Sequence, residues 1–181
     1  MANREALRDL QTRLANRLQA AKKEALSVSS WLAIESGGQF YLLPLGHSGE
    51  IFPWSSIQKV PYTQKWFLGI ANLRGGLVGV VDLAILLGTL SGVTEQTART
   101  AQSSSEASLL AFNTALEINA ALLVDRLAGL RGIDAFVSSE APPAGTPSFF
   151  GMVYIDALGN RWQELNLQLL AQYPTFLSIC A

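Results

Sequence analysis

Cysteine and histidine are almost absent from this chain of 181 residues: each occurs once, as Cys180 and His47. A single cysteine excludes an internal disulfide framework, and one cysteine with one histidine is too few for a conventional Cys/His zinc site. His47 has no serine or cysteine nucleophile spaced to it as in a known catalytic motif, so we interpret it as an ordinary loop residue. The sequence predicts no metal site, no cofactor site and no catalytic residue.

Charged residues are also scarce, at 15% of the chain against roughly 25% in average soluble domains. Thirteen Lys and Arg against 14 Asp and Glu give a net charge of -1, which disfavours nucleic acid as a partner because its phosphates call for a basic surface. Apolar residues make up 49%, which excludes disorder for most of the chain. This composition indicates either a large core or surface patches that other proteins cover, and we favour the second.

No apolar run is long enough to span a membrane. The longest, Leu77–Leu90, has 14 residues and is interrupted by Asp82, whereas a span needs about 17 or more. Residues 1–26 carry nine charges where a secretion signal would need an apolar stretch. We therefore expect a soluble cytoplasmic protein.

The segment from Asn3 to Leu26 is predicted to form an amphipathic helix. It contains no Pro or Gly, and apolar residues recur every three or four positions, at Leu7, Leu10, Leu14, Leu18, Ala21 and Ala25. Its other faces carry six basic and three acidic residues, so its net charge is +3 and the rest of the chain carries -4. Its leucine stripe needs a surface to lie on, and either its own domain or a partner helix or dimer seam would serve.

After Ser27 short apolar runs separated by turn residues predict β-strands. The clearest runs are Trp31–Ile34, Phe40–Leu45, Phe67–Leu73 and Leu77–Val81. Asp82 then precedes an apolar run and Gly88, which indicates a short helix over Leu83–Leu87 capped by Asp82 and ended by Gly88. The polar stretch Ser91–Ala107 is interpreted as a linker.

The second half of the chain repeats the first at offsets of 78 to 84 residues. Leu109–Phe112 aligns with Trp31–Ile34, and Asn166 aligns with Asp82. Each copy has about five short strands and ends in a short helix, and closing each copy into a small barrel would remove its strand edges. The long loop before the second terminal hairpin is predicted over Ser138–Ser148.

These observations predict a mainly β fold with two side-by-side five-stranded barrels. The predicted boundaries are an N-terminal helical extension over 1–28, subdomain 1 over about 29–90, a linker over 91–107, subdomain 2 over about 108–174, and a tail over 175–181.

One arginine stands at the tip of a predicted tight hairpin, in Asn72-Leu73-Arg74-Gly75-Gly76. Its guanidinium must project into solvent or onto a partner, and the residues alone leave docking and simple solvation open. The carboxylates are better explained structurally, Asp82 as a helix cap and Asp156 as a turn residue. The four tryptophans are interpreted as core or interface anchors.

The segment Phe67–Gly75 and the following Leu77–Leu83 resemble the signature hairpin of CheW-like domains. The stretches Ser48–Ile51, Val60-Pro61 and Leu122–Leu127 match at the expected places, and the resemblance spans residues 30–172. The predicted N-terminal helix and the residues from Leu170 to Leu177 are most similar to the PilI-type branch, which serves type IV pilus, twitching or phototaxis systems. Two departures are Gly79, where the family usually has proline, and a more polar last strand over Asn160–Leu165.

The resemblance implies an adaptor without catalysis, built on two SH3-like subdomains, that couples methyl-accepting chemoreceptors to a CheA-type histidine kinase in the control of type IV pilus motility or phototaxis. Asn72, Arg74 and Gly75 match the family hairpin and are the implied partner-binding residues. A receptor tip would lie between the barrels, and the kinase's own similar domain would meet a barrel end. The resemblance implies a cytoplasmic location at membrane receptor arrays, without membrane insertion. The alternatives are a small-ligand-binding β-barrel and an enzyme with a site around Asp82 or His47.

Overall fold

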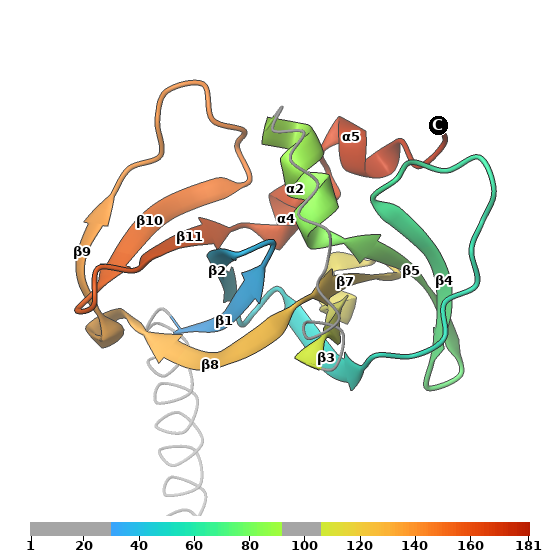
Figure 1. Cartoon of the computed structure of the whole chain (residues 1–181), viewed down its shortest axis with the longest axis horizontal. Helices are drawn as coiled ribbons and strands as arrows, with labels where there is room; N and C mark the ends of the chain where they lie inside the picture. Colours follow the sequence, from blue (N-terminus) through green and yellow to red (C-terminus); the bar gives the residue numbers. More distant parts are fainter. Residues whose placement is uncertain (1–29, 92–105) are drawn as a thin grey trace, which may run out of the picture.

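The computed structural model describes residues 30–91 and 106–181. The helix predicted over residues 3–26 and most of the linker predicted over residues 91–107 lie outside these ranges. Within the described ranges, eleven strands form two sheets side by side, and three short helices pack between them at one end (Figure 1). The predicted mainly β fold class is confirmed.

One sheet has six strands, in the order β8-β1-β2-β11-β10-β9, and the other has five, in the order β3-β6-β7-β5-β4. The strands of the six-stranded sheet are β1 (Ser30–Ser36), β2 (Gln39–Pro44), β8 (Arg126–Gly132), β9 (Phe136–Glu140), β10 (Phe150–Asp156) and β11 (Arg161–Leu165). Those of the five-stranded sheet are β3 (Ser48–Pro53), β4 (Phe67–Leu73), β5 (Gly76–Asp82), β6 (Ser108–Phe112) and β7 (Ala120–Val124). The helices are α2 (Leu83–Ser91), α4 (Leu167–Ala171) and α5 (Pro174–Leu177), with single 3-10 turns η1 (Thr114–Leu116) and η2 (Ile133–Ala135).

The two sequence repeats exchange strands. β1 and β2 of the first repeat join β8 to β11 of the second, whereas β6 and β7 of the second repeat join β3, β4 and β5 of the first. The exchange is symmetric, because β2 runs parallel to β11 just as β7 runs parallel to β5. Each sheet therefore contains strands of both halves, and the divisions at about 29–90 and 108–174 do not correspond to the two sheets.

Two further details differ from the predicted pair of five-stranded barrels. The six-stranded sheet has gained β9, which occupies the first residues of the loop predicted over Ser138–Ser148. The hydrogen-bonded orders of the described strands are also open, ending at β8 and β9 in one sheet and at β3 and β4 in the other. The edge of β4 is partly covered by Gln58, which exchanges two backbone hydrogen bonds with Ile70 at 2.8 and 2.9 Å.

The main hydrophobic core draws on both sheets and all three described helices. Two smaller clusters cover the opposite faces of the sheets, one for each sheet. In β1, for example, Leu32 and Ile34 belong to the main core while Trp31 and Ala33 belong to the cluster on the other face. All five residues of β7 are buried, which explains why this strand is a continuous apolar run rather than an alternating one.

Equivalent caps begin the helix that ends each repeat. Asp82 Oδ1 accepts a hydrogen bond from the Ile85 N–H at 3.2 Å, and Asn166 Oδ1 accepts one from the Leu169 N–H at 3.1 Å. The predicted cap and its alignment with Asn166 are confirmed. Gly88 does not end α2 as predicted, because the helix continues and packs Leu90 against the main core.

Asp156 organises the turn between β10 and β11, as predicted. Its Oδ1 accepts from the N–H groups of Leu158 and Asn160, both at 2.9 Å, and its Oδ2 accepts from Asn160 Nδ2 at 2.9 Å and Trp162 Nε1 at 3.0 Å. The side-chain hydrogen bonds from Asn160 and Trp162 favour the charged carboxylate and lower the pKa of Asp156 from 3.8 to about 2.

The Asp156 carboxylate is expected to make stability depend on pH in acid. Its pKa is lower in the folded chain than its ordinary value, so its contribution is complete above about pH 4 and is lost as the pH falls towards about 2. Urea unfolding of the wild type and Asp156→Asn measures this, and the difference between them should shrink between about pH 7 and about pH 2.5.

Glu140→Gln is the matched control for Asp156→Asn. It removes an exposed ion pair with Arg161 and should change stability little. A deficit of Asp156→Asn that is equal at neutral and acid pH would contradict the assignment.

Candidate partner-binding surface

Arg74 and Gly75 form the two-residue turn between β4 and β5. Leu73 pairs with Gly76 in the strand register, so only Arg74 and Gly75 lie in the turn. Both have left-handed backbone conformations, with φ of 49° and 85°. Two-residue hairpin turns favour this combination because it matches the twist of the strands. The predicted tight hairpin with an arginine at its tip is confirmed.

Asn72 holds this turn from the end of β4. Its Oδ1 accepts a hydrogen bond from the Gly75 N–H at 2.8 Å, which is the local contact that makes asparagine common in turns. Among the three residues that the sequence predicts to bind a partner, Asn72 and Gly75 therefore shape the turn. Arg74 is the residue among the three whose charged side chain can contact a partner, because that side chain is 75% exposed.

Arg74 contacts an acidic residue that sequence reasoning did not place in the site. Its Nη2 lies 2.5 Å from Oε1 of Glu50 on β3. Its guanidinium carbon lies 5.9 Å from the centre of the Phe52 ring. Because β3 and β4 are opposite edges of the five-stranded sheet, this contact shows that the sheet curls until its edges approach. The one feature of the sequence that could have pointed to Glu50 is that it lies in Ser48–Ile51, one of the stretches that resemble CheW-like domains.

Exposed apolar side chains occur on or next to the strands that carry the ion pair. Leu77 lies opposite Asn72 across the hairpin and is 69% exposed, and Ile51 is exposed beside Glu50. Trp54, directly after β3, is half exposed, whereas the other three tryptophans are buried. Exposed apolar and aromatic residues on the same strands as an exposed arginine are the composition expected of a protein contact.

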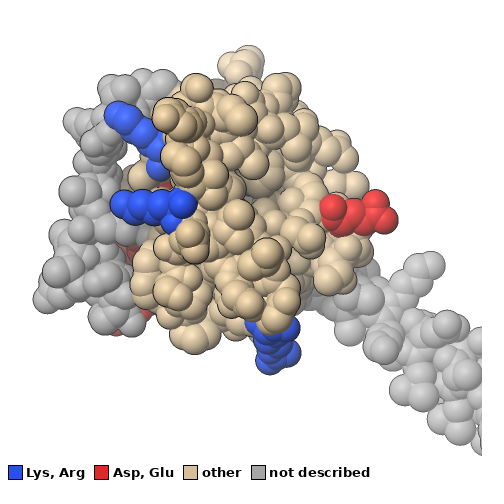
Figure 2. Space-filling view, turned by 90° about the vertical axis from the view of Figure 1, so that its right-hand side faces the viewer, with Lys and Arg blue, Asp and Glu red and all other residues tan. Residues whose placement is uncertain are grey.

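The end of the molecule that carries β4 and the preceding loop has few charged side chains on its surface (Figure 2). From Ile51 to Val81 the sequence has no acidic residue, and its basic residues are Lys59, Lys65 and Arg74. The described residues as a whole have six basic and ten acidic residues, so the acidic charge lies elsewhere. A face with little charge loses little hydration energy when a partner covers it.

The two residues around which the sequence left an enzyme site open, Asp82 and His47, both have structural contacts. Asp82 caps α2, and His47 lies in the turn between β2 and β3, where its backbone N–H donates to the Pro44 carbonyl at 2.9 Å. Within the described residues, His, Cys, Asp and Glu side chains form no group of three that could hold a metal ion.

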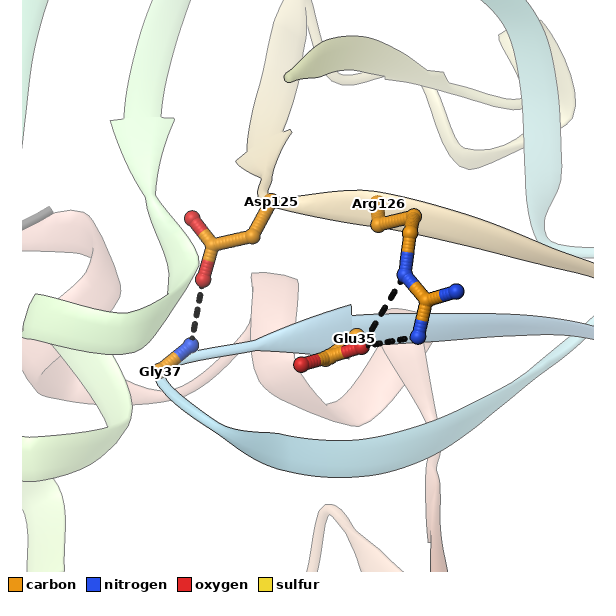
Figure 3. Close-up of polar contacts among 4 residues, drawn as sticks. All are labelled: Glu35, Gly37, Asp125 and Arg126. Atoms are coloured by element: carbon orange, nitrogen blue, oxygen red, sulfur yellow. Dashed lines mark hydrogen bonds and ion pairs between the residues drawn. The ribbon is translucent and has the colours of Figure 1, made fainter. Parts of the chain in front are cut away.

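A second polar cluster joins the two exchanged repeats (Figure 3). Asp125 lies where the chain leaves β7 in one sheet for β8 in the other, and its Oδ2 accepts from the Gly37 N–H at 2.7 Å. The Asp125 N–H donates to the Glu35 carbonyl at 3.0 Å. Arg126 donates from Nε and Nη2 to Glu35 Oε2 at 3.1 and 2.5 Å. These contacts tie the β1–β2 turn to the crossing between the sheets.

Asp125→Ala is expected to lower the free energy of unfolding by about 1–3 kcal/mol, because it leaves the Gly37 N–H without its acceptor. Hydrogen exchange at the Gly37 amide should speed up in the same variant. Glu35→Gln is the control, since it weakens only the exposed pair with Arg126. Unchanged exchange at Gly37 in Asp125→Ala would rule out this contact as a restraint on the turn.

The family model of the CheW-like domain matches residues 30–173, which contain both sheets, the Arg74 turn and Glu50. This chain belongs to the CheW-like domain family. The resemblance inferred from the hairpin and its flanking stretches is thereby confirmed.

A relative and a solved structure extend this result. The chain is similar to protein PilI of Pseudomonas aeruginosa, with 28% identity over 165 residues that cover 88% of this chain and 84% of that protein. It is also similar to the crystal structure of the scaffolding protein TtCheW from Thermoanaerobacter tengcongensis, with a TM-score of 0.61 and 20% identity, covering 81% of this chain and 94% of that one. The second likeness shows a shared fold.

Gly79 departs from the CheW-like pattern for a reason that the structure shows. Its backbone N–H donates to the Asn119 carbonyl at 3.0 Å, which a proline could not do. A Cβ at position 79 would also come within 3.0 Å of the Phe67 ring. The residue therefore supports a contact between β5 and Asn119, the residue before β7.

None of the helices in the described ranges is both long and apolar enough to cross a membrane.

Proposed function

We propose that this chain is an adaptor without catalytic activity that couples methyl-accepting chemoreceptors to a CheA-type histidine kinase. The observation that carries the proposal is the Arg74 turn, in which a guanidinium is mounted on two left-handed residues and paired with Glu50 on a face with little other charge. A side chain oriented before binding loses less entropy when a partner arrives. Membership of the CheW-like family supports the proposal.

Arg74 is the proposed direct contact, and Asn72 and Gly75 are proposed to hold it in position. The exposed Leu77 and the half-exposed Trp54 would add apolar contact area around the guanidinium. In this proposal a receptor tip lies between the two sheets and the kinase meets the end of a sheet. Both partners would be bound at the cytoplasmic side of membrane receptor arrays.

We further propose that the system controls type IV pilus motility, or phototaxis through the same type of machinery. The support is similarity to PilI along most of both chains.

A reconstituted coupling assay tests the adaptor function. Receptor-containing membranes and a purified CheA-type kinase from the same organism are mixed with or without the full chain, and kinase autophosphorylation is followed. We expect receptor-dependent phosphorylation only when the chain is present. If the chain bound neither the kinase nor the receptor at low salt, the proposal would be contradicted. Turnover of a substrate by the purified chain would favour the enzyme alternative.

A further inference from the structure

We propose that the N-terminal segment, residues 3–26, lies on an exposed strip of its own chain that connects the two edge strands of the six-stranded sheet. This β8–β9 strip consists of Leu130, Ile133, Asp134 and Val137, where the chain passes from β8 through η2 into β9. The inference is independent of receptor and kinase coupling.

The β8–β9 strip is apolar and acidic on its outward side. Leu130 and Val137 are each 68% exposed and Ile133 is 49% exposed, within a stretch of eight residues. Asp134 is exposed, and no ion pair to it occurs among the described residues. The basic residue in this stretch, Arg131, is turned to the other face of the sheet, with its guanidinium carbon 4.4 Å from the centre of the buried Trp162 ring.

The N-terminal segment joins the described fold at the middle of this strip. Ser30, the first residue of β1, pairs with Gly132, which lies between Leu130 and Ile133. Because β1 and β8 are antiparallel, the N-terminal end of β1 lies beside the end of β8 that leads into Ile133 and Asp134. Three residues, 27–29, separate Leu26 from Ser30, so the end of the segment is four residue steps, at most about 14 Å, from Ser30.

The segment is chemically complementary to the strip. Its sequence has a stripe of leucines and a net charge of +3, whereas the described residues carry six basic and ten acidic residues. Lys22 and Lys23 are its basic residues nearest to Ser30, and Asp134 is the acidic residue of the strip. A short tether gives the segment an effective concentration of order millimolar at this strip, which favours it over a segment of another molecule.

Disulfide trapping in the full chain tests where the leucine stripe lies. In a Cys180→Ser background, the pair Leu18→Cys and Leu130→Cys should form a disulfide within one chain, seen as a monomer of altered mobility on a non-reducing gel. The control pair Leu18→Cys and Leu177→Cys uses a similarly exposed leucine on α5 and should react much less. If all disulfides formed between chains, the stripe would lie on a second copy and the proposal would be overturned. Equal yields from the two pairs would also overturn it.

Hydrogen exchange provides an independent measurement on the full chain. Leu14→Asp with Leu18→Asp should speed exchange of the amides from Ile133 to Val137 by about tenfold, because it removes two leucines from the covering stripe. Asn16→Asp places a carboxylate on the opposite side of the predicted helix, with one added negative charge against two in the double variant, and should leave exchange unchanged. Equal exchange in the double variant and the wild type would overturn the proposal.

Discussion

Gly69→Ala is expected to lower the free energy of unfolding by about 3–5 kcal/mol, because a methyl group has no room at this position in β4. Gly69 has a φ of 134°, which side chains rarely adopt, and an added Cβ would lie 2.1 Å from the Gln58 carbonyl oxygen. Relieving that clash would separate Gln58 from Ile70 and break both of their backbone hydrogen bonds. The edge of β4 would then be uncovered.

Gly76→Ala is the matched control for this substitution. Gly76 belongs to the same hairpin, its φ is not left-handed, and an added Cβ would meet its nearest neighbour, the Leu73 carbonyl oxygen, at an ordinary 3.4 Å. Urea unfolding followed by circular dichroism should show a small change for Gly76→Ala and a large loss, or failure to fold, for Gly69→Ala. Similar stabilities of the two variants would contradict the close approach of Gln58.

Arg74→Glu is expected to weaken binding of the kinase or the receptor by about 30-fold or more, the range of a residue at the centre of an interface. The fold should persist, because the pair with Glu50 is exposed and worth under about 1 kcal/mol. Calorimetric titration measures the affinity, and thermal unfolding by circular dichroism measures the fold. Lost stability with unchanged affinity would make Arg74 a structural residue.

Two variants sharpen the Arg74 experiment. Arg161→Glu makes the same substitution at another exposed, ion-paired arginine, on β11 of the other sheet, and should leave affinity unchanged. The double variant Arg74→Glu with Glu50→Arg restores an ion pair with reversed polarity. If Arg74 contacts the partner, this double variant stays defective, whereas recovery of binding would show that the pair acts only by holding the hairpin to β3.

Features with local causes could be predicted from the sequence. The Arg74 turn follows from residues within five positions of one another, and its conformation needs only the glycine and the asparagine beside it. The caps at Asp82 and Asn166 likewise depend on a side chain and an N–H three residues later. The end of α2 was predicted incorrectly because packing of Leu90 against the core, rather than Gly88, decides it.

Features that depend on distant contacts could not be predicted. Glu50 and Arg74 are 24 positions apart in sequence and meet only because the five-stranded sheet curls. The polar residues of β11 are another example: Glu164 accepts hydrogen bonds from Trp31 Nε1 at 2.9 Å and from the Met152 N–H at 3.3 Å. Their polarity reflects partners inside the sheet, and no pattern within β11 reveals those partners.

The amino-acid sequence by itself determined a mainly β chain with two copies of one strand pattern, the hairpin that carries Arg74, and the capped helix that ends each copy. Only the tertiary structure decided which sheet each strand joins and which acidic residue meets Arg74. The physical reason is that the hydrogen bonds of turns and caps join residues a few positions apart, whereas strand pairing joins distant residues. The two repeats have similar strands, so β1 and β2 have similar candidate strands to pair with in either repeat. The choice between these strands depends on burying both faces of each sheet at once. With the strands exchanged between the repeats, one face of each sheet packs on the main core and the other face on a smaller cluster.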